Sequence, residues 1–385
     1  MINFPKHATT VMSPTSPPFN VAIIGYGLAA KVFHIPFILA LPSSFNLYGI
    51  VQRHATSNNS ASHDHPNIKT WTSTSSMLSD QSVDLVVITA VPSTHFDLCT
   101  QALTAGKHVL CEKPFTPTSS EASQLAALAL NSKKVLAVYQ NRRWDADFLN
   151  LKSLVTPPSQ ELGRIVEVHT HFDRHRPDPP SPTSVTWKAA DNLPAGGAIY
   201  DLGTHLLDQL VNLFGMPARV TAFIGNQRIY TEAGTGGDAG GDSFTVLLHY
   251  KDGMLATAKA GVVSAEVEQL RYWVRGTKGS FRKYNLDVQE DQLKAGLRPG
   301  EDEEFGMETE SSNGTVTRLD QSGKPYTSKL KAAHPPATYR AFYEELAKAL
   351  AGDGKVPVSP EEAAAVIRLI ELCKESSTKG RTLDV

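Results

Sequence analysis

The chain has 385 residues, of which 41% are hydrophobic and 20% are charged, and its formal net charge is −2. This length is too great for one ordinary domain and predicts two, while the near-neutral charge argues against a dedicated nucleic-acid or anionic-membrane partner. No apolar run approaches the roughly 18–20 residues that span a membrane. The three cysteines lack metal or disulfide spacing, which favours a reducing compartment, so we expect a cytoplasmic protein.

Residues 1–18 are rich in Ser, Thr and Pro and have no apolar signal core, so we expect a disordered tail. The pattern that follows divides the rest of the chain into two parts. Residues 19–142 read as a dinucleotide-binding domain, and residues 143–385 as a substrate-binding and oligomerisation domain.

A glycine-rich turn follows the first apolar run, Asn20–Ile24. Gly25, Gly27 and Ala30 form the Gly-x-Gly-x-x-Ala pattern, in which the first glycine permits a tight turn and the second lets backbone approach a pyrophosphate. The anion would lie on the free N–H groups at the start of the next helix. A purely structural turn is the alternative, since glycine turns between strand and helix are common.

The second expected strand, Asn46–Arg53, ends without the Asp or Glu that grips the ribose 2′-hydroxyl in NAD-specific sites. Gln52, Arg53 and His54 stand there instead. An arginine binds a 2′-phosphate, so we expect NADP(H) to be preferred over NAD(H). The alternative is that Arg53 is only a solvated loop charge. The histidines between His54 and His65 have no metal-ligand spacing, so we expect no metal.

Residues 83–139 continue the alternation of strands and helices that predicts a doubly wound parallel sheet. Thr94 and Asp97 suggest the cap of one helix, and Thr118 with Glu121 the cap of another. The strand at 108–111 delivers Lys113 to the carboxyl end of the sheet, where ligands bind in this architecture. The expected strands are 83–89, 108–111 and 135–139, and the first expected helix is 96–105.

In the second half of the chain, apolar and polar residues alternate with a period of two. This pattern predicts an open, mainly antiparallel sheet in an α+β domain. A helix over 198–214 interrupts the strands, and residues 286–335 read as a mobile loop with one short helix. Two helices, 338–351 and 359–375, close the chain, and the last is expected to pack back on the first domain. The expected strands are 164–172, 219–224, 243–250, 254–261, 270–275 and 280–284.

The expected helix 198–214 carries Asp201 and His205, which are four residues apart and would share one face. An imidazole beside a carboxylate is a proton-transfer pair, in which the acid orients the ring. The alternative is a helix cap with a buried structural pair.

Three motifs together resemble the Gfo/Idh/MocA oxidoreductases: the glycine turn at 25–30, Glu112–Lys113–Pro114, and Gly196–His205. The resemblance covers about residues 19–385. Further stretches, Asn141–Asp145 and Phe172–Pro177, are similar to a branch that includes NADP-dependent scyllo-inositol dehydrogenases. The Pro-rich insert at 177–182 departs from that pattern, which leaves the substrate open.

The resemblance implies that Lys113, Asp201 and His205 are catalytic. Lys113 would donate a hydrogen bond to the reacting oxygen, His205 would exchange the proton, and Asp201 would orient the substrate or the imidazole. The expected cofactor-binding residues are Gly25, Tyr26, Gly27, Leu28, Ala29, Arg53, Thr89, Val91, Pro92, His95, Glu112, Lys113, Asn141 and Arg142. The expected substrate-binding residues are Lys113, Arg142, Arg174, Trp187, Tyr200, Asp201 and His205, with Arg143, Arg176 and Lys188 as further candidates.

These expectations describe an NAD(P)-dependent oxidoreductase that moves hydride between nicotinamide and a CH–OH or C=O group of a polyol, cyclitol or sugar. A reductase of a non-sugar carbonyl or imine and a non-catalytic dinucleotide-sensing regulator remain alternatives. The resemblance also implies a homodimer or higher homo-oligomer formed through the open sheet.

Overall fold

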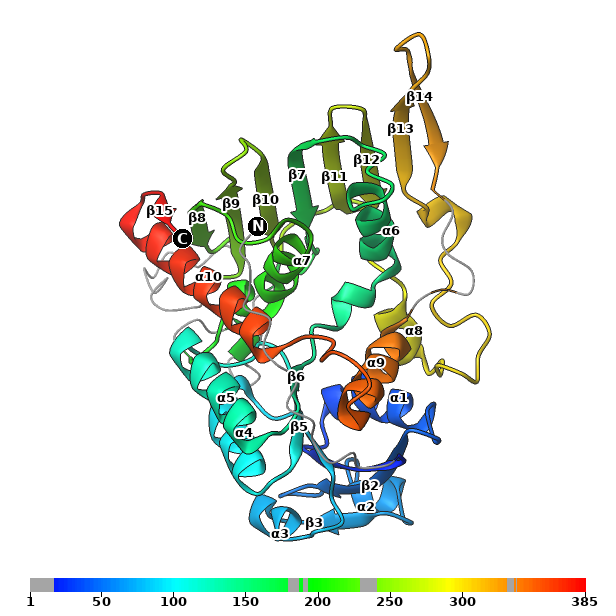
Figure 1. Cartoon of the computed structure of the whole chain (residues 1–385), viewed down its shortest axis with the longest axis vertical. Helices are drawn as coiled ribbons and strands as arrows, with labels where there is room; N and C mark the ends of the chain where they lie inside the picture. The colour runs from blue at the N-terminus through cyan, green and yellow to red at the C-terminus, as the bar shows by residue number, and fades with distance from the viewer. Residues whose placement is uncertain (1–16, 179–186, 190–192, 229–240, 331–335, 337) are drawn as a thin grey trace.

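The computed structural model in Figure 1 describes residues 17–178, 187–189, 193–228, 241–330, 336 and 338–385. The expected N-terminal tail and most of the Pro-rich insert therefore lie outside the described residues. The described chain forms two sheets, each with its own helices. No helix among these residues is long and apolar enough to cross a membrane.

The first sheet has six parallel strands in the order β3-β2-β1-β4-β5-β6, which confirms the predicted doubly wound arrangement. Its central strands are buried on both faces, as their unbroken apolar sequences require. The strand order reverses beside β1, so a crevice opens at the carboxyl ends of β1 and β4. The strands are β1 (Phe19–Ile24), β2 (Phe45–Val51), β3 (Lys69–Trp71), β4 (Leu85–Ile88), β5 (His108–Cys111) and β6 (Leu136–Val138).

The helices of this domain are α1 (Ile35–Leu39), α2 (Ala61–Asp64), α3 (Thr74–Leu78), α4 (His95–Thr104) and α5 (Ser119–Ser132). The Thr118–Glu121 capping box at α5 is confirmed. The predicted cap at Thr94 is wrong: its hydroxyl donates to the carbonyl of Val91 at 2.8 Å. A 3₁₀ turn already precedes α4 there, so Thr94 has helical backbone and its side chain turns back.

The second sheet has nine strands in the order β14-β13-β12-β11-β7-β10-β9-β8-β15, and only β7 and β10 pair in parallel in this described sheet. This confirms the predicted open, mainly antiparallel sheet. The strands are β7 (Ile165–His171), β8 (Arg219–Gly225), β9 (Ser243–His249), β10 (Leu255–Ala260), β11 (Leu270–Gly276), β12 (Gly279–Tyr284), β13 (Thr315–Leu319), β14 (Pro325–Lys329) and β15 (Leu383–Asp384).

The prediction of a loop with one helix over 286–335 is wrong in part. The short helix exists as α8 (Gln289–Ala295), but β13 and β14 form a hairpin that projects beyond the sheet in Figure 1. Every residue of β14 is exposed. A strand that buries neither face carries no hydrophobic alternation, so the pattern that reveals the other strands is missing here.

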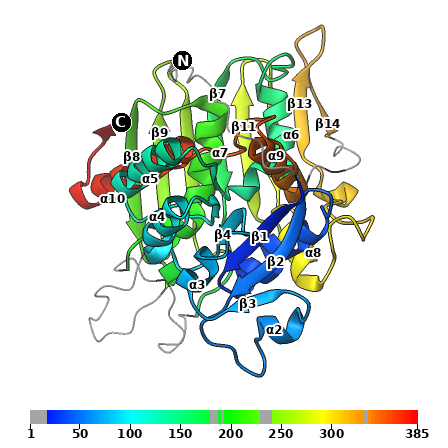
Figure 2. The same cartoon turned by 60° about the horizontal axis from the view of Figure 1, so that its bottom comes forward.

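The remaining helices, α6 (Ala146–Val155), α7 (Thr204–Phe214), α9 (Tyr339–Ala351) and α10 (Pro360–Lys379), lie between the large sheet and the first domain (Figure 2). Helix α10 contacts both β8 and α5. Its Glu371 accepts hydrogen bonds from the backbone N–H and the hydroxyl of Ser119, at 2.8 and 2.6 Å. The C-terminal helix therefore joins the two domains.

Candidate active site

A cleft of about 1100 Å³ runs between the two domains, from the glycine turn to the end of β7. Most of the residues expected at the site line it. These are Gly25, Tyr26, Gly27, Leu28, Ala29, Arg53, Thr89, Val91, Glu112, Lys113, Asn141, Arg142, Arg174, Arg176, Trp187, Lys188, Asp201 and His205. The nucleotide half and the sheet half thus share one cavity.

His95 and Pro92 do not line the cleft, contrary to the expectation that they bind the cofactor. His95 is fully buried, and its ring nitrogens lie 3.0 Å from the carbonyl oxygens of Pro114 and Ala90. The His95 ring therefore connects the loops that follow β4 and β5, and it supports these loops from the side away from the cleft. Pro92 is buried at the start of the 3₁₀ turn.

Tyr200 and Arg143 also lie away from the cleft. The Tyr200 hydroxyl donates to the carbonyl of Pro117 at 2.8 Å, so the ring faces the other domain. The Arg143 guanidinium is buried and forms a two-point ion pair with Asp208, at 2.7 and 2.8 Å. The sequence does not show which of the neighbours Tyr200 and Asp201 faces the cleft. Adjacent residues of a helix point in different directions, so only one of the two can do so.

The glycine turn allows a ligand to approach its backbone closely. Gly25 has φ +100°, and a Cβ there would lie 2.9 Å from the Thr89 hydroxyl oxygen. A Cβ on Gly27 would meet nothing within 4 Å. The helical segment that follows begins as a π turn (Ala29–His34), and the residues at its start, Gly27–Ala29, line the cleft. The first N–H groups of a helix have no intrahelical partners and can bind an anion. The open space at Gly27 is the room that a pyrophosphate would use.

At the far end of this half, Gln52, Arg53 and His54, which follow β2, line the cleft. Gln52 is held by the loop, donating to the carbonyl of Asn59 at 2.8 Å and accepting from the N–H of Ala61 at 2.7 Å. Arg53 is exposed on the cleft wall and forms no ion pair with the described residues. Its guanidinium is thus available to a ligand.

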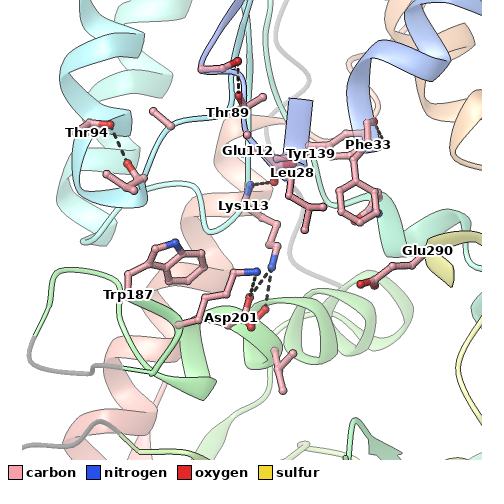
Figure 3. Close-up of a pocket in the computed structure, with 18 of the residues that line it drawn as sticks. Leu28, Phe33, Thr89, Thr94, Glu112, Lys113, Tyr139, Trp187, Asp201 and Glu290 are labelled. Carbon is pink, nitrogen blue, oxygen red and sulfur yellow. Dashed lines mark hydrogen bonds and ion pairs between the residues drawn. The ribbon is translucent and has the colours of Figure 1, made fainter. Parts of the chain in front are cut away.

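Lys113 reaches across the cleft from the end of β5 to the second domain (Figure 3). Its ammonium donates to the Asp201 carboxylate at 3.0 Å and to the Asp201 carbonyl at 3.1 Å. Lys188 lies 3.6 Å from the same carboxylate. Although burial by itself raises the pKa of Asp201, the two ammonium groups outweigh it and lower that pKa to about 2.

The backbone beneath Lys113 is anchored by a buried chain of hydrogen bonds. Glu112 accepts from the Lys113 N–H at 2.9 Å, and its other oxygen lies 3.0 Å from His34 Nε2. His34 Nδ1 in turn lies 2.6 Å from the Tyr343 hydroxyl on α9. A helix from the end of the chain therefore helps to aim the lysine.

Asp201 and His205 do not form the expected pair. Residues Ile199–Gly203 form a π turn, which has a longer repeat than an α-helix and so displaces the i,i+4 alignment. Asp201 binds Lys113, and His205 Nδ1 is buried with no hydrogen-bond partner among the described residues. Burial and then the positive charges of Lys113 and Arg142 lower the pKa of His205 well below its ordinary value. The imidazole is therefore neutral at neutral pH.

The sequence did not predict that two residues of α8, Glu290 and Lys294, line the cleft. Glu290 forms an ion pair with Arg142, and Lys294 bonds to the same Glu290 carboxylate. Asp242 and Arg228 also line the cleft, 3.8 Å apart. The acidic and basic residues of 286–335 carry no recognisable motif, so only the folded contact with Arg142 identifies Glu290.

Comparison with known proteins agrees with this layout. A family profile described as the NAD-binding Rossmann fold of an oxidoreductase family matches residues 19–140. A second, described as the C-terminal alpha/beta domain of that family, matches residues 159–385.

Three relatives show the extent of the similarity. An uncharacterized oxidoreductase of Schizosaccharomyces pombe is 36% identical, covering 96% of this chain and all of its own length. The scyllo-inositol 2-dehydrogenase (NADP(+)) of Bacillus subtilis is 33% identical, covering 94% of this chain and 95% of its own. The solved structure of YPO2259 from Yersinia pestis is 35% identical with a TM-score of 0.83, covering 95% of this chain and 97% of its own.

Gly27→Ala tests whether the glycine turn binds a dinucleotide. The space around Gly27 accommodates the methyl group in the free protein, so the midpoint of urea unfolding should stay unchanged. The methyl group would occupy the path of the pyrophosphate, so we expect NADPH affinity, measured by fluorescence, to fall about tenfold or more. The matched control is Gly225→Ala, where a Cβ also meets nothing but lies outside the cleft. Equal NADPH affinity in the two variants would contradict the assignment.

Proposed function

Because the chain belongs to the Gfo/Idh/MocA oxidoreductase family, we propose that it is an NADP(H)-dependent dehydrogenase or reductase acting on a CH–OH or C=O group of a polyol, cyclitol or sugar. The observation that carries the proposal is the meeting of Lys113 and His205 in the cleft that starts at the glycine turn. The similarity to a scyllo-inositol 2-dehydrogenase supports the substrate class.

The cleft suits a dinucleotide at one end and a small polar substrate at the other. The turn at Gly25–Ala29 would hold the pyrophosphate, and Thr89 and Val91 would line the path toward the centre. Asn141 and Arg142 would lie near the nicotinamide. When bound, the nicotinamide supplies the hydride acceptor or donor.

The protein's own residues supply the proton chemistry. In oxidation, the Lys113 ammonium donates a hydrogen bond to the substrate oxygen and stabilises the negative charge that develops there. The neutral His205 lines the same cleft and accepts the hydroxyl proton. Reduction runs these roles in reverse. Asp201 keeps the ammonium charged and aimed, because burial and the nearby Lys188 otherwise lower the pKa of Lys113.

Lys113→Ala tests the catalytic assignment. Loss of the ammonium removes the group that stabilises the developing alkoxide, so kcat should fall by about 10²–10⁴-fold. NADPH binding, followed by fluorescence, should survive because the glycine turn is untouched. Turnover is measured at the reduced-nicotinamide absorbance band with a panel of polyols and ketones. A variant with unchanged turnover on the same substrate would refute the role given to Lys113.

Cofactor choice is proposed to rest on Arg53. The exposed guanidinium has no partner among the described residues and would pair with a 2′-phosphate. In Arg53→Ala, kcat/KM with NADP should therefore fall about 10- to 100-fold, the range expected for lost charge-assisted hydrogen bonds. The value with NAD should change little and serves as the internal control. An equal NADP preference before and after the substitution would rule Arg53 out.

We also propose that the helix-free face of the nine-stranded sheet binds a second copy. In the described residues, Leu247, Thr257, His169 and Trp273 are cross-strand neighbours on that face, and Phe223 is 62% exposed nearby. Light scattering should give twice the mass of the chain, and Trp273→Glu should shift it toward the monomer because a charge would be buried. A monomeric wild-type protein would contradict this assembly.

A further inference from the structure

Arg174 stands out in the substrate half of the cleft because its charge is not balanced. Its guanidinium lines the cleft, and no described residue forms a side-chain hydrogen bond or ion pair with it. Burial, followed by the like charges of Arg176 and Arg142, lowers the pKa of Arg174. An unpaired, partly desolvated cation is costly unless a ligand supplies the counter-charge.

The acidic residues of this half are mostly already engaged. Asp201 binds Lys113 and Lys188, and Asp242 lies beside Arg228. Glu290, likewise, is shared between Arg142 and Lys294.

Beyond these pairs, the charged groups that the described residues contribute to this end are Arg174, Arg176 and Asp178, all lining the cleft. Asp178 is exposed to solvent and pairs with no described cation. Two arginines against one exposed carboxylate leave the local charge positive.

The backbone holds the two arginines on the same side. Residues 174 and 176 are extended, with their N–H groups donating to the carbonyls of Gly261 and Val262 at 2.9 and 2.7 Å. Alternate residues of an extended segment point in one direction. The Arg174 guanidinium also lies over the Phe172 ring, 4.6 Å from its centroid. This contact holds the guanidinium beside the ring without using its N–H groups, which stay available to a ligand.

We propose that Arg174 is the anion-binding group of the substrate site, so that the substrate carries a carboxylate or phosphate in addition to the reacting hydroxyl or carbonyl. This inference rests on the proposed function, since it places the anion on the substrate of the same cleft. The cofactor pyrophosphate is a poor alternative, because the charged groups that act on Arg174 are Asp201, Arg176, Glu290 and Arg142, none of which belongs to the glycine turn.

The test compares sugars that differ only in charge. Calorimetry on the NADP-loaded protein measures the binding of sugar acids and sugar phosphates, each against its neutral parent, such as D-glucuronate and D-glucose 6-phosphate against D-glucose. We expect at least one anionic member to bind about 10- to 100-fold more tightly than its parent. If the sugar acids bind more tightly, the anionic group that Arg174 recognises is a carboxylate. If the sugar phosphates bind more tightly, it is a phosphate.

Variants then assign the effect to Arg174. Arg174→Met should leave NADPH affinity unchanged and should weaken the binding of the anionic sugar about 10-fold or more beyond any change for its neutral parent. Arg174→Lys should keep part of the anionic preference, because an ammonium retains charge without the two-point geometry. Arg164→Met is the matched control, an exposed arginine outside the cleft with no described ion pair. Circular dichroism checks that each variant folds.

The outcomes separate this inference from the proposed function. Tight binding of an anionic sugar that depends on Arg174, without any turnover, would sustain the anion site and count against the dehydrogenase. Turnover of neutral polyols with no anionic preference would overturn the anion site alone. The anion site is also overturned if Arg174→Met weakens NADPH or the neutral sugars as much as the charged ones.

Discussion

The contact between the Lys113 ammonium and Asp201 is the constraint on which the site depends. One partner comes from the carboxyl end of β5 and the other from the π turn before α7, so the ion pair forms only when the two domains close on each other. Lys113 binds both the side chain and the backbone of Asp201, which fixes the direction of its approach. The architecture thus brings a cation to the middle of the cleft and holds it beside a carboxylate that stays ionised.

The floor of the cleft is a connected polar network in which few groups are free to move. Gln209 donates to the backbone carbonyl of Arg142 at 2.7 Å and accepts from Arg271 and Tyr272 at 2.8 and 2.7 Å. Arg271 is itself paired with Asp147. Networks of this kind hold their members in one geometry when every group is satisfied. Three buried atoms at this place have no hydrogen-bond partner among the described residues: Asp147 Oδ1, Arg142 Nε and His205 Nδ1.

Sequence patterns were most informative where burial imposes a period. The apolar parallel strands, the alternating strands β7–β12 and the capping box at Thr118 were all predictable, because one face or one end of each element is fixed by the core. The hairpin β13–β14 was missed because β14 is exposed throughout and β13 buries only Val316, so no such period marks it. The Asp201–His205 pairing failed for a related reason: a π turn cannot be read from residue spacing. Glu290 reaches the cleft only through tertiary contact with Arg142, which no local pattern encodes.

Helices α9 and α10 limit where the chain can be divided into two halves, because both helices contact the nucleotide half. They follow the large sheet in the chain, yet Tyr343 bonds to His34 and Glu371 bonds to Ser119 in the nucleotide half. A fragment that ended near residue 142 would lose the contact between α10 and β6 and the Tyr343 hydroxyl that bonds to His34. Grafting this nucleotide half onto another catalytic half would therefore require transplanting the last two helices as well, and modular exchange in this architecture should respect three-dimensional rather than linear boundaries.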